Sequence, residues 1–339
     1  GEQFIQAHVP VAIGRLLGRG ISQEHARYKK AFAAELTRAR RRNNVVYQSA
    51  AIALGLLVDA RHEQDKVYSK ALLGYYHRGR DQQSRYFALM AMAAIGGAEN
   101  RTALLKALAQ GRKNVEKPWA ALALGVLTHK ARKLDPHADD ATVGEAILEE
   151  LRHTKNKASR GAYAVALGLC GYRDAASEMR ALVEKNHNHD ELAGYLCIGL
   201  ALMDDRKAVP LLRDLVRNSV RRPELLRQAA IALGKLRDKS ATDLLLELIA
   251  DNDPNTARLA AVATGLGYIG DRRTVGPLLH YLFDDGMTRL SRAFVAAALG
   301  SIADKEPVPF SSRYAAYGNY RASVGTLTNA AGTGILDLL

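Results

Sequence analysis

Proline, cysteine, aromatic side chains and long apolar runs are all scarce in this chain of 339 residues. It has 9 prolines, 2 cysteines and 6% aromatic residues. No apolar run reaches the roughly 18 residues that a membrane-spanning helix needs, so we expect no transmembrane segment. Cys170 and Cys197 lie in apolar, helix-like stretches, which predicts buried free thiols rather than a disulfide or a zinc site. Because alanine and leucine supply most of the apolar content, helices are favoured.

Catalytic signatures are missing as well. We find no G-x-S-x-G elbow, no H-E-x-x-H helix and no phosphate-binding P-loop. The string from Gly265 to Gly270 spells G-x-G-x-x-G, but 257–264 read as helix where a dinucleotide fold needs a strand. We therefore expect neither a cofactor nor an enzyme. Two polar groups could hold a metal ion, although a solvated turn is favoured for both: His187, His189, Asp190 and Glu191, and His137, Asp139 and Asp140.

A short apolar string that ends in a small residue recurs along the chain. Four successive intervals are 33 residues long, and two longer ones, of 41 and 43, predict inserted loops, one of them His129–Asp140. Ala12–Gly14 fits a ninth, degraded copy. The last positions of the other copies are Gly55, Gly96, Gly125, Gly168, Ala201, Gly234, Gly267 and Gly300. A fixed period of this length is the signature of a repeat array.

Each copy predicts a helix, a short turn and a second helix. The alanines let two helices approach closely, and the final glycine removes a side chain where a neighbour crosses. Four residues later comes an aspartate suited to cap the next helix. These aspartates are Asp59, Asp205, Asp238, Asp271 and Asp304. One such hairpin cannot bury its apolar face alone, but stacked neighbours can.

The strings Arg227–Asp238 and Arg160–Gly168 resemble the HEAT-repeat superfamily, especially its short form in bacterial proteins and bilin-lyase-like subunits. The resemblance spans about 9–305. It implies an all-α, right-handed α-solenoid of about eight to nine two-helix repeats. HEAT arrays mostly bind proteins, sometimes nucleic acid, and rarely catalyse. We therefore expect a solenoid over 1–305 and a non-repeat tail over 306–339.

Positive charge is concentrated at one end of the chain. Residues 1–133 hold 23 Lys and Arg against 9 Asp and Glu, a net charge of +14, whereas 134–339 carry −1. An acidic partner suits such a segment, although a solvated basic surface remains the alternative. The clustered cations are Arg38, Arg40, Arg41, Arg42, Arg78, Arg80, Arg85, Arg112, Lys113, Lys130, Arg132 and Lys133.

The tail after the repeats has a different composition. Pro307 and Pro309 break the helical pattern, and four aromatic residues follow within eleven positions. Either the tail caps the last repeat or it docks into a partner. The residues that would dock are Phe310, Tyr314, Tyr317, Tyr320, Ile335, Leu336, Leu338 and Leu339.

Three functions follow in order of preference. The first is a non-catalytic scaffold or assembly subunit that binds a protein, one with an acidic surface. The second is nucleic-acid or polyanion binding through the basic N-terminal part, and the third is an enzyme or lyase-like accessory subunit. The chain opens at Gly1 on a helix-like stretch, which fits a processed or truncated product. We expect a soluble protein, cytoplasmic or exported.

Overall fold

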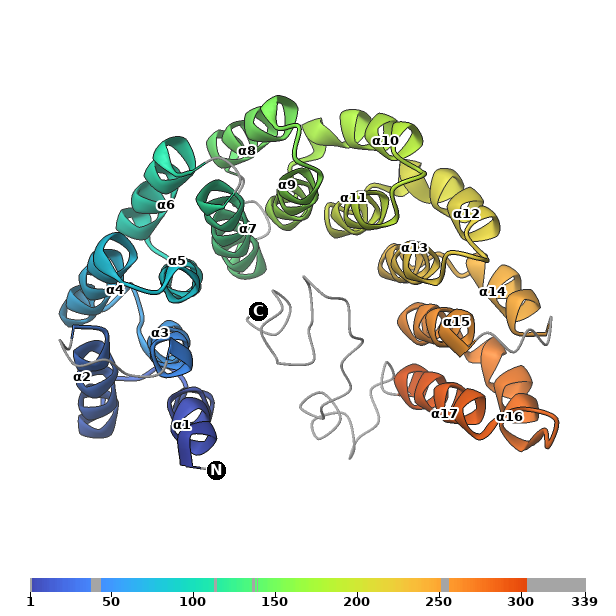
Figure 1. The fold of residues 1–339 in the computed structure, drawn as a ribbon, viewed down its shortest axis with the longest axis horizontal. Coiled ribbons are helices and arrows are strands. Elements are labelled where there is room, and N and C mark those ends of the chain that lie inside the picture. Colours follow the sequence, from blue (N-terminus) through green and yellow to red (C-terminus); the bar gives the residue numbers. More distant parts are fainter. Residues whose placement is uncertain are drawn as a thin grey trace. The chain divides into compact units, whose positions relative to one another are not determined.

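The computed structural model describes residues 2–37, 44–112, 115–135, 138, 140–250 and 256–303 (Figure 1). Within these ranges the chain forms seventeen α-helices and four short 3-10 helices, and no strand. The described residues divide into two compact units, one that ends at Cys170 and one that begins at Gly171. None of the described helices is both long and apolar enough to cross a membrane.

The first unit has two layers of helices (Figure 1). The odd-numbered helices form the inner layer: α1 (Glu2–Leu17), α3 (Asn44–Leu57), α5 (Gln82–Ile95), α7 (Glu116–Leu134) and α9 (Lys157–Cys170). The outer layer consists of α2 (Gln23–Thr37), α4 (Lys66–Arg78), α6 (Ala98–Gln110) and α8 (Ala141–His153), with the 3-10 helix η1 (Glu63–Asp65) before α4. Successive inner helices of the unit pack on one another, and each inner helix from α3 onward also packs on the outer helix that precedes it.

The second unit repeats this plan. Its inner layer holds α11 (Asp190–Leu202), α13 (Pro223–Lys235), α15 (Thr256–Ile269) and α17 (Arg289–Ala303). Its outer layer holds α10 (Ala176–Lys185), α12 (Val209–Asn218), α14 (Ala241–Ala250) and α16 (Val275–Phe283). Three 3-10 helices lead into outer helices: η2 (Arg173–Ala175), η3 (Arg206–Ala208) and η4 (Arg272–Thr274). The predicted all-α solenoid of stacked two-helix repeats is confirmed.

Glycines at the ends of the repeated strings allow the inner helices to touch. A Cβ on Gly55 would lie 3.1 Å from the Ala91 Cα on the next inner helix. A Cβ on Gly234 would lie 2.6 Å from the Tyr268 Cβ, closer than side chains in proteins come. Gly14 of α1 faces α3 in the same way, 3.2 Å from the Ala53 Cα. The predicted role of these glycines is confirmed, and α1 is the ninth copy.

Two details of the repeat differ from the prediction. Gly96 is not a packing position, because it lies one residue past the end of α5, with φ of 82° and nothing within 4 Å of its hypothetical Cβ. A glycine there serves to end the helix, since other residues rarely adopt positive φ. The expected loop His129–Asp140 is helical up to Leu134, so part of the insertion lengthens α7.

The repeated aspartates act as caps in part. Asp271 Oδ1 accepts a hydrogen bond from the Arg273 backbone N–H at 3.1 Å and caps η4. Asp238 likewise accepts from the Ser240 N–H at 3.3 Å. Asp205 makes no capping bond and instead pairs with an arginine of the preceding outer helix, Arg180. Capping is therefore confirmed at Asp271 but wrong for Asp205. Asp238 and Asp59 accept backbone bonds within the turns before α14 and η1 without capping either helix, and Asp304 lies outside the described residues.

An arginine–aspartate ladder joins successive repeats of the second unit. Arg180 of α10 pairs with Asp205, and Arg213 of α12 pairs with Asp238 at 2.6 Å. Both pairs span 25 residues and are related by one repeat of 33. The ladder stops at the next repeat, where Asp271 takes Arg273 from its own turn. Sequence analysis missed these pairs because the two partners lie in neighbouring repeats.

Both cysteines are buried free thiols, as predicted. Burial raises the pKa of Cys197 to about 12. The Thr128 hydroxyl donates to the Cys170 Sγ at 3.2 Å. A thiol with a raised pKa is a poor nucleophile and a poor metal ligand, so Cys197 contributes to packing.

Candidate binding surface

The inner helices of the first unit begin side by side along one edge, which we call the N-edge (residues 78–85, 112 and 115–119). Asn44 Nδ2 at the start of α3 donates to Asp81 Oδ1, just before α5, at 2.9 Å. Arg85 Nη2 in the first turn of α5 donates to Glu116 Oε1, the first residue of α7, at 3.1 Å. The loops that join outer to inner helices therefore lie next to one another at this edge.

The opposite ends of these helices form a second edge, the C-edge (residues 15–19, 56–61, 94–97 and 130–134). Two cations converge there on one carbonyl at the end of α5. Arg19 Nη2 donates to the Ala94 oxygen, and Lys130 Nζ approaches the same oxygen at 3.4 Å. Cations suit this position because the end of a helix presents unpaired carbonyls and partial negative charge.

The cations that the sequence predicts as one basic surface are divided between these edges. Arg78, Arg80 and Arg112 lie at the N-edge, are exposed, and make no side-chain hydrogen bond or ion pair among the described residues. Lys130, Arg132 and Lys133 lie at the other end of α7, at the C-edge.

Arg85 belongs to the interior of the N-edge. Its side chain is only 19% exposed and donates to the Tyr76 carbonyl as well as to Glu116. The guanidinium also lies 5.5 Å from the centre of the Tyr76 ring. Arg85 is thus already satisfied within the fold, and we leave it out of the binding surface proposed below.

Aromatic side chains pack beneath the N-edge. The Tyr86 and Trp119 rings stack with centroids 5.6 Å apart, and Phe87 lies 6.2 Å from Trp119. Burial raises the pKa of Tyr86 and of Tyr76. Such contacts join α5 to α7 and contribute about 0.5–1.5 kcal/mol each beyond the area they bury.

Lys130 has an unusual environment for a surface cation. Burial, with the nearby charges of Arg19 and Lys133, lowers its pKa to about 8. Its one hydrogen-bond acceptor among the described residues is the Ala94 carbonyl. No carboxylate pairs with it there, so the C-edge holds positive charge that its own surroundings do not neutralise.

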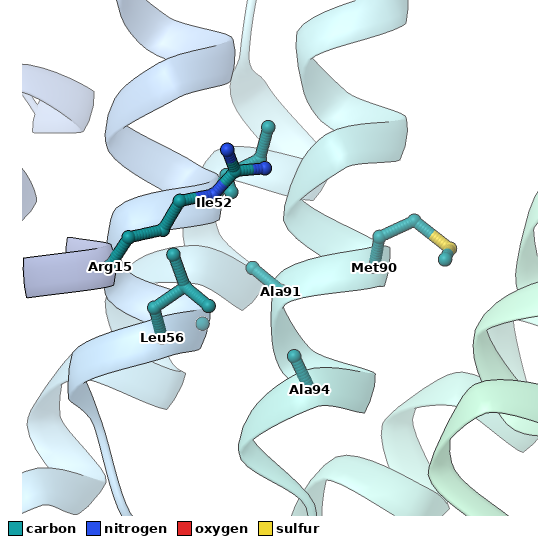
Figure 2. A pocket seen from close by; sticks show the side chains of 7 residues that line it. Arg15, Ile52, Leu56, Met90, Ala91 and Ala94 are labelled. Atoms are coloured by element: carbon teal, nitrogen blue, oxygen red, sulfur yellow. The ribbon is translucent and has the colours of Figure 1, made fainter. Parts of the chain in front are cut away.

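A pocket opens between α1, α3 and α5 next to this charge (Figure 2). The empty space within it, including the part that is open to solvent, is about 380 Å³. Its lining is Arg15, Ile52, Gly55, Leu56, Met90, Ala91 and Ala94. Figure 2 shows the Arg15 side chain reaching from α1 over the pocket beside Ile52 and Leu56, with Ala91 and Ala94 on α5. Arg15 is exposed and has no hydrogen bond or ion pair in the described part of the chain.

Sequence analysis missed this pocket and its cations Arg15 and Arg19. Arg15 directly follows Gly14 in the degraded first copy, and Arg19 lies in the turn after it. Neither belongs to a run of charge. These two cations lie at a pocket only because three helices from different repeats, α1, α3 and α5, come together there. The sequence has no local signal for that contact.

Several predicted residues lie outside the described part of the chain. They are Arg38, Arg40, Arg41, Arg42 and Lys113 of the basic set, His137 and Asp139 of the insertion, and Phe310, Tyr314, Tyr317, Tyr320, Ile335, Leu336, Leu338 and Leu339 of the tail. Their roles stay predictions.

The sequence motifs that resemble a dinucleotide site or a metal site lie in a packed helix and in an exposed turn. Gly265 and Gly267 lie inside α15, and a Cβ on Gly265 would lie 2.5 Å from the Ala230 Cβ, so this glycine serves helix packing. His187 and His189 are exposed in the turn before α11. No group of three or more His, Cys, Asp or Glu among the described residues is arranged to hold a metal ion.

Ion pairs neutralise part of the positive charge in both units. In the second unit the pairs include Arg213 with Asp238, Arg180 with Asp205, Arg222 with Asp190, Arg227 with Glu224 and Arg273 with Asp271. In the first unit they include Arg85 with Glu116, Arg101 with Asp140 and Lys117 with Glu150. The exposed cations that the first unit leaves without such a partner among the described residues include Arg15, Arg78, Arg80 and Arg112.

Comparison with known families agrees with this architecture. Residues 185–264 match the family model described as HEAT repeats. The matched segment runs from the end of α10 into α15 and includes two complete repeats of 33 residues. The predicted HEAT-repeat resemblance is confirmed by this match. The search of curated proteins returned no match.

Proposed function

We propose that this chain is a non-catalytic protein-binding scaffold whose first unit binds an acidic partner protein. HEAT repeats commonly serve as protein-interaction scaffolds. The observation that carries the proposal is a set of unpaired cations in the first unit. Arg15, Arg78, Arg80, Arg112 and Lys130 have no carboxylate partner among the described residues, although neighbours such as Arg85 and Arg61 are paired.

The physical basis is complementarity. Exposed arginines such as Arg78, Arg80 and Arg112 can each form two hydrogen bonds to one carboxylate, which gives direction as well as attraction. Ring stacking of Tyr86 on Trp119 joins α5 to α7, the helices next to these arginines. Attraction between unlike surfaces also raises the rate of association.

The test begins with the immobilised full chain and an extract of its native source, treated with nuclease. We expect a stoichiometric protein to be retained, and its affinity is then measured with purified components. The variant Arg78→Glu/Arg80→Glu/Arg112→Glu is expected to weaken binding by about ten-fold or more. A control with the same charge change in the second unit, Lys207→Glu/Arg221→Glu/Lys239→Glu, is expected to stay within about two-fold.

Two results would contradict the proposal. One is that no protein remains bound after nuclease treatment. The other is that both triple variants weaken the purified complex equally, because the loss would then reflect net charge and not a surface of the first unit.

Nucleic-acid or polyanion binding is the second candidate, and a specific observation favours it. Arg78, Arg80 and Arg112 lie in successive loops of one edge, as contacts to a row of phosphates require. Fluorescence anisotropy with labelled RNA and DNA duplexes tests this directly. Affinity in the same range as for the purified partner, lost in the N-edge variant, would favour this candidate.

A further inference from the structure

The pocket between α1, α3 and α5 has a lining of a definite kind. Ile52, Leu56, Ala91 and Ala94 give it an apolar floor without an aromatic side chain. Gly55 keeps the floor open, because it brings α3 within van der Waals contact of Ala91 while adding no side chain. The empty space of about 380 Å³ includes the part that is open to solvent, so the pocket is a shallow hollow. It can take the end of one aliphatic side chain rather than a folded element.

Positive charge surrounds this apolar floor. Arg15 lines the pocket itself and has no ionic partner among the described residues. Arg19 and Lys130 both donate to the carbonyl of Ala94, which is also a lining residue. Three cations from α1, the following turn and α7 therefore lie around one hollow.

The nearest carboxylate, Asp59, offsets only part of this charge. Asp59 is bound by Arg61 at 2.6 Å, whereas Arg19 reaches it only at 4.0 Å. Asp59 also makes a second hydrogen bond to the Arg61 backbone N–H at 3.0 Å, so its oxygens are occupied. Lys133 adds another positive charge and is close enough to Lys130 to lower the pKa of that lysine.

We propose that this pocket binds a short segment of a partner protein that carries leucine-like side chains flanked by carboxylates. The apolar side chain enters between Leu56 and Ala94, and the carboxylates meet Arg15 on one side and Arg19 and Lys130 on the other. Nucleic acid fits the site poorly, because bases of single strands are held mainly by stacking on aromatic side chains and the lining has none. The inference rests on the proposed function and specifies where one contact of the scaffold lies.

The experiment uses the full chain and a fluorescein-labelled synthetic peptide of leucines flanked by glutamates, followed by fluorescence anisotropy. Ala94→Phe fills the half-exposed rim of the pocket, and Arg15→Glu reverses its exposed cation. Each is expected to weaken peptide binding by about ten-fold or more. Matched controls on the outer helix α6, Ala109→Phe and Lys106→Glu, are expected to change it by less than about two-fold.

Two further peptides separate the contributions. Replacing the glutamates by glutamines removes the charge, and replacing the leucines by serines removes the apolar contact. Both are expected to weaken binding by about ten-fold or more. Unchanged helical circular dichroism in Ala94→Phe and Arg15→Glu shows that any loss is local. If Ala94→Phe loses helical circular dichroism, its binding result is set aside, and Arg15→Glu and the two altered peptides decide the test.

The proposal is overturned if the wild-type chain does not bind the acidic leucine peptide. It is equally overturned if the peptide binds but neither Arg15→Glu nor removal of the leucines or glutamates weakens it. Retention of the native partner together with either result would refute the pocket alone, since the scaffold function is measured with the whole partner and the N-edge variant.

Discussion

At the scale of single residues, close packing of the inner helices depends on side chains that are absent. Gly234 is in α13, where a Cβ would meet the Tyr268 Cβ at 2.6 Å and the Tyr268 carbonyl carbon at 2.8 Å. The Tyr268 carbonyl carbon belongs to the backbone, so α15 itself would have to move to remove the clash. The position was predictable from the repeated string, but the identity of the neighbour was not, because it lies a repeat away.

Gly234→Ala is therefore expected to destabilise the protein even though alanine favours helices. The gain in helix propensity is about 1 kcal/mol and overpacking costs about 1–3 kcal/mol, so we expect a net loss of about 1 kcal/mol. Gly276→Ala is the matched control in the same unit, because nothing lies within 4 Å of the added Cβ. Urea unfolding followed by circular dichroism measures both. A stabilised Gly234→Ala would refute the packing argument.

Asp271 allows a prediction about pH. Its side chain is 5% exposed, and hydrogen bonds from Arg273 lower its pKa. A carboxyl with a lowered folded-state pKa stabilises the protein above its unfolded value of about 3.9, and this contribution is lost as pH falls through the folded value. Asp271→Asn is thus expected to cost about 1–3 kcal/mol at neutral pH, with the difference from wild type shrinking below about pH 4.

Unfolding of both proteins by urea across this pH range gives the measurement. Asp174→Asn, at an exposed position of the same unit, is the control and is expected to stay within about 0.5 kcal/mol at every pH. A constant difference between Asp271→Asn and wild type down to the acid limit would mean that the charge of Asp271 contributes nothing.

At the scale of helices, the repeat period of the sequence predicted most of the helical arrangement. It predicted the inner helices, their glycines and several turn aspartates. It could not predict that α7 extends to Leu134, because the residues after His129 are polar and carry no repeat signal. The pairing of each inner helix with the outer helix before it also escaped prediction, since both neighbours in sequence are equally close along the chain.

Asp140 illustrates how a polar loop residue serves a helix. It caps α8 by accepting from the Val143 N–H at 3.2 Å, and it pairs with Arg101 of α6 at 2.6 Å. Asp140→Ala is expected to destabilise the protein by about 1–2 kcal/mol through loss of the cap. Asp140→Asn keeps a capping oxygen, so we expect a smaller loss in thermal or urea unfolding. Equal losses of stability in Asp140→Ala and Asp140→Asn would mean that the ion pair with Arg101, and not the cap, accounts for the destabilisation.

At the scale of the whole molecule, the charge asymmetry was evident from the sequence, but its division was not. Residues 1–133 carry +14, and the simplest expectation is one basic stripe. In the structure, Arg112 and Lys133 lie at opposite ends of α7. Arg85 forms an ion pair with Glu116 and is therefore not part of an exposed basic surface. The reason is geometric: the ends of the chain segments that lead into inner helices lie at the N-edge, with Arg78, Arg80 and Arg112, whereas the end of α7, with Lys130 to Lys133, lies at the C-edge.

Dependence on salt distinguishes the two candidate functions. For a protein partner, raising ionic strength from about 0.1 to 1 M shortens the screening length from about 10 to 3 Å, so exposed attraction weakens while apolar contact persists. We expect the affinity to fall and then level off. For nucleic acid, log affinity falls linearly with log salt, at about −0.9 per phosphate contacted on B-DNA, without levelling. The N-edge variant should flatten the dependence in either case, so the shape of the wild-type curve, measured by titration with the purified ligand, decides between them.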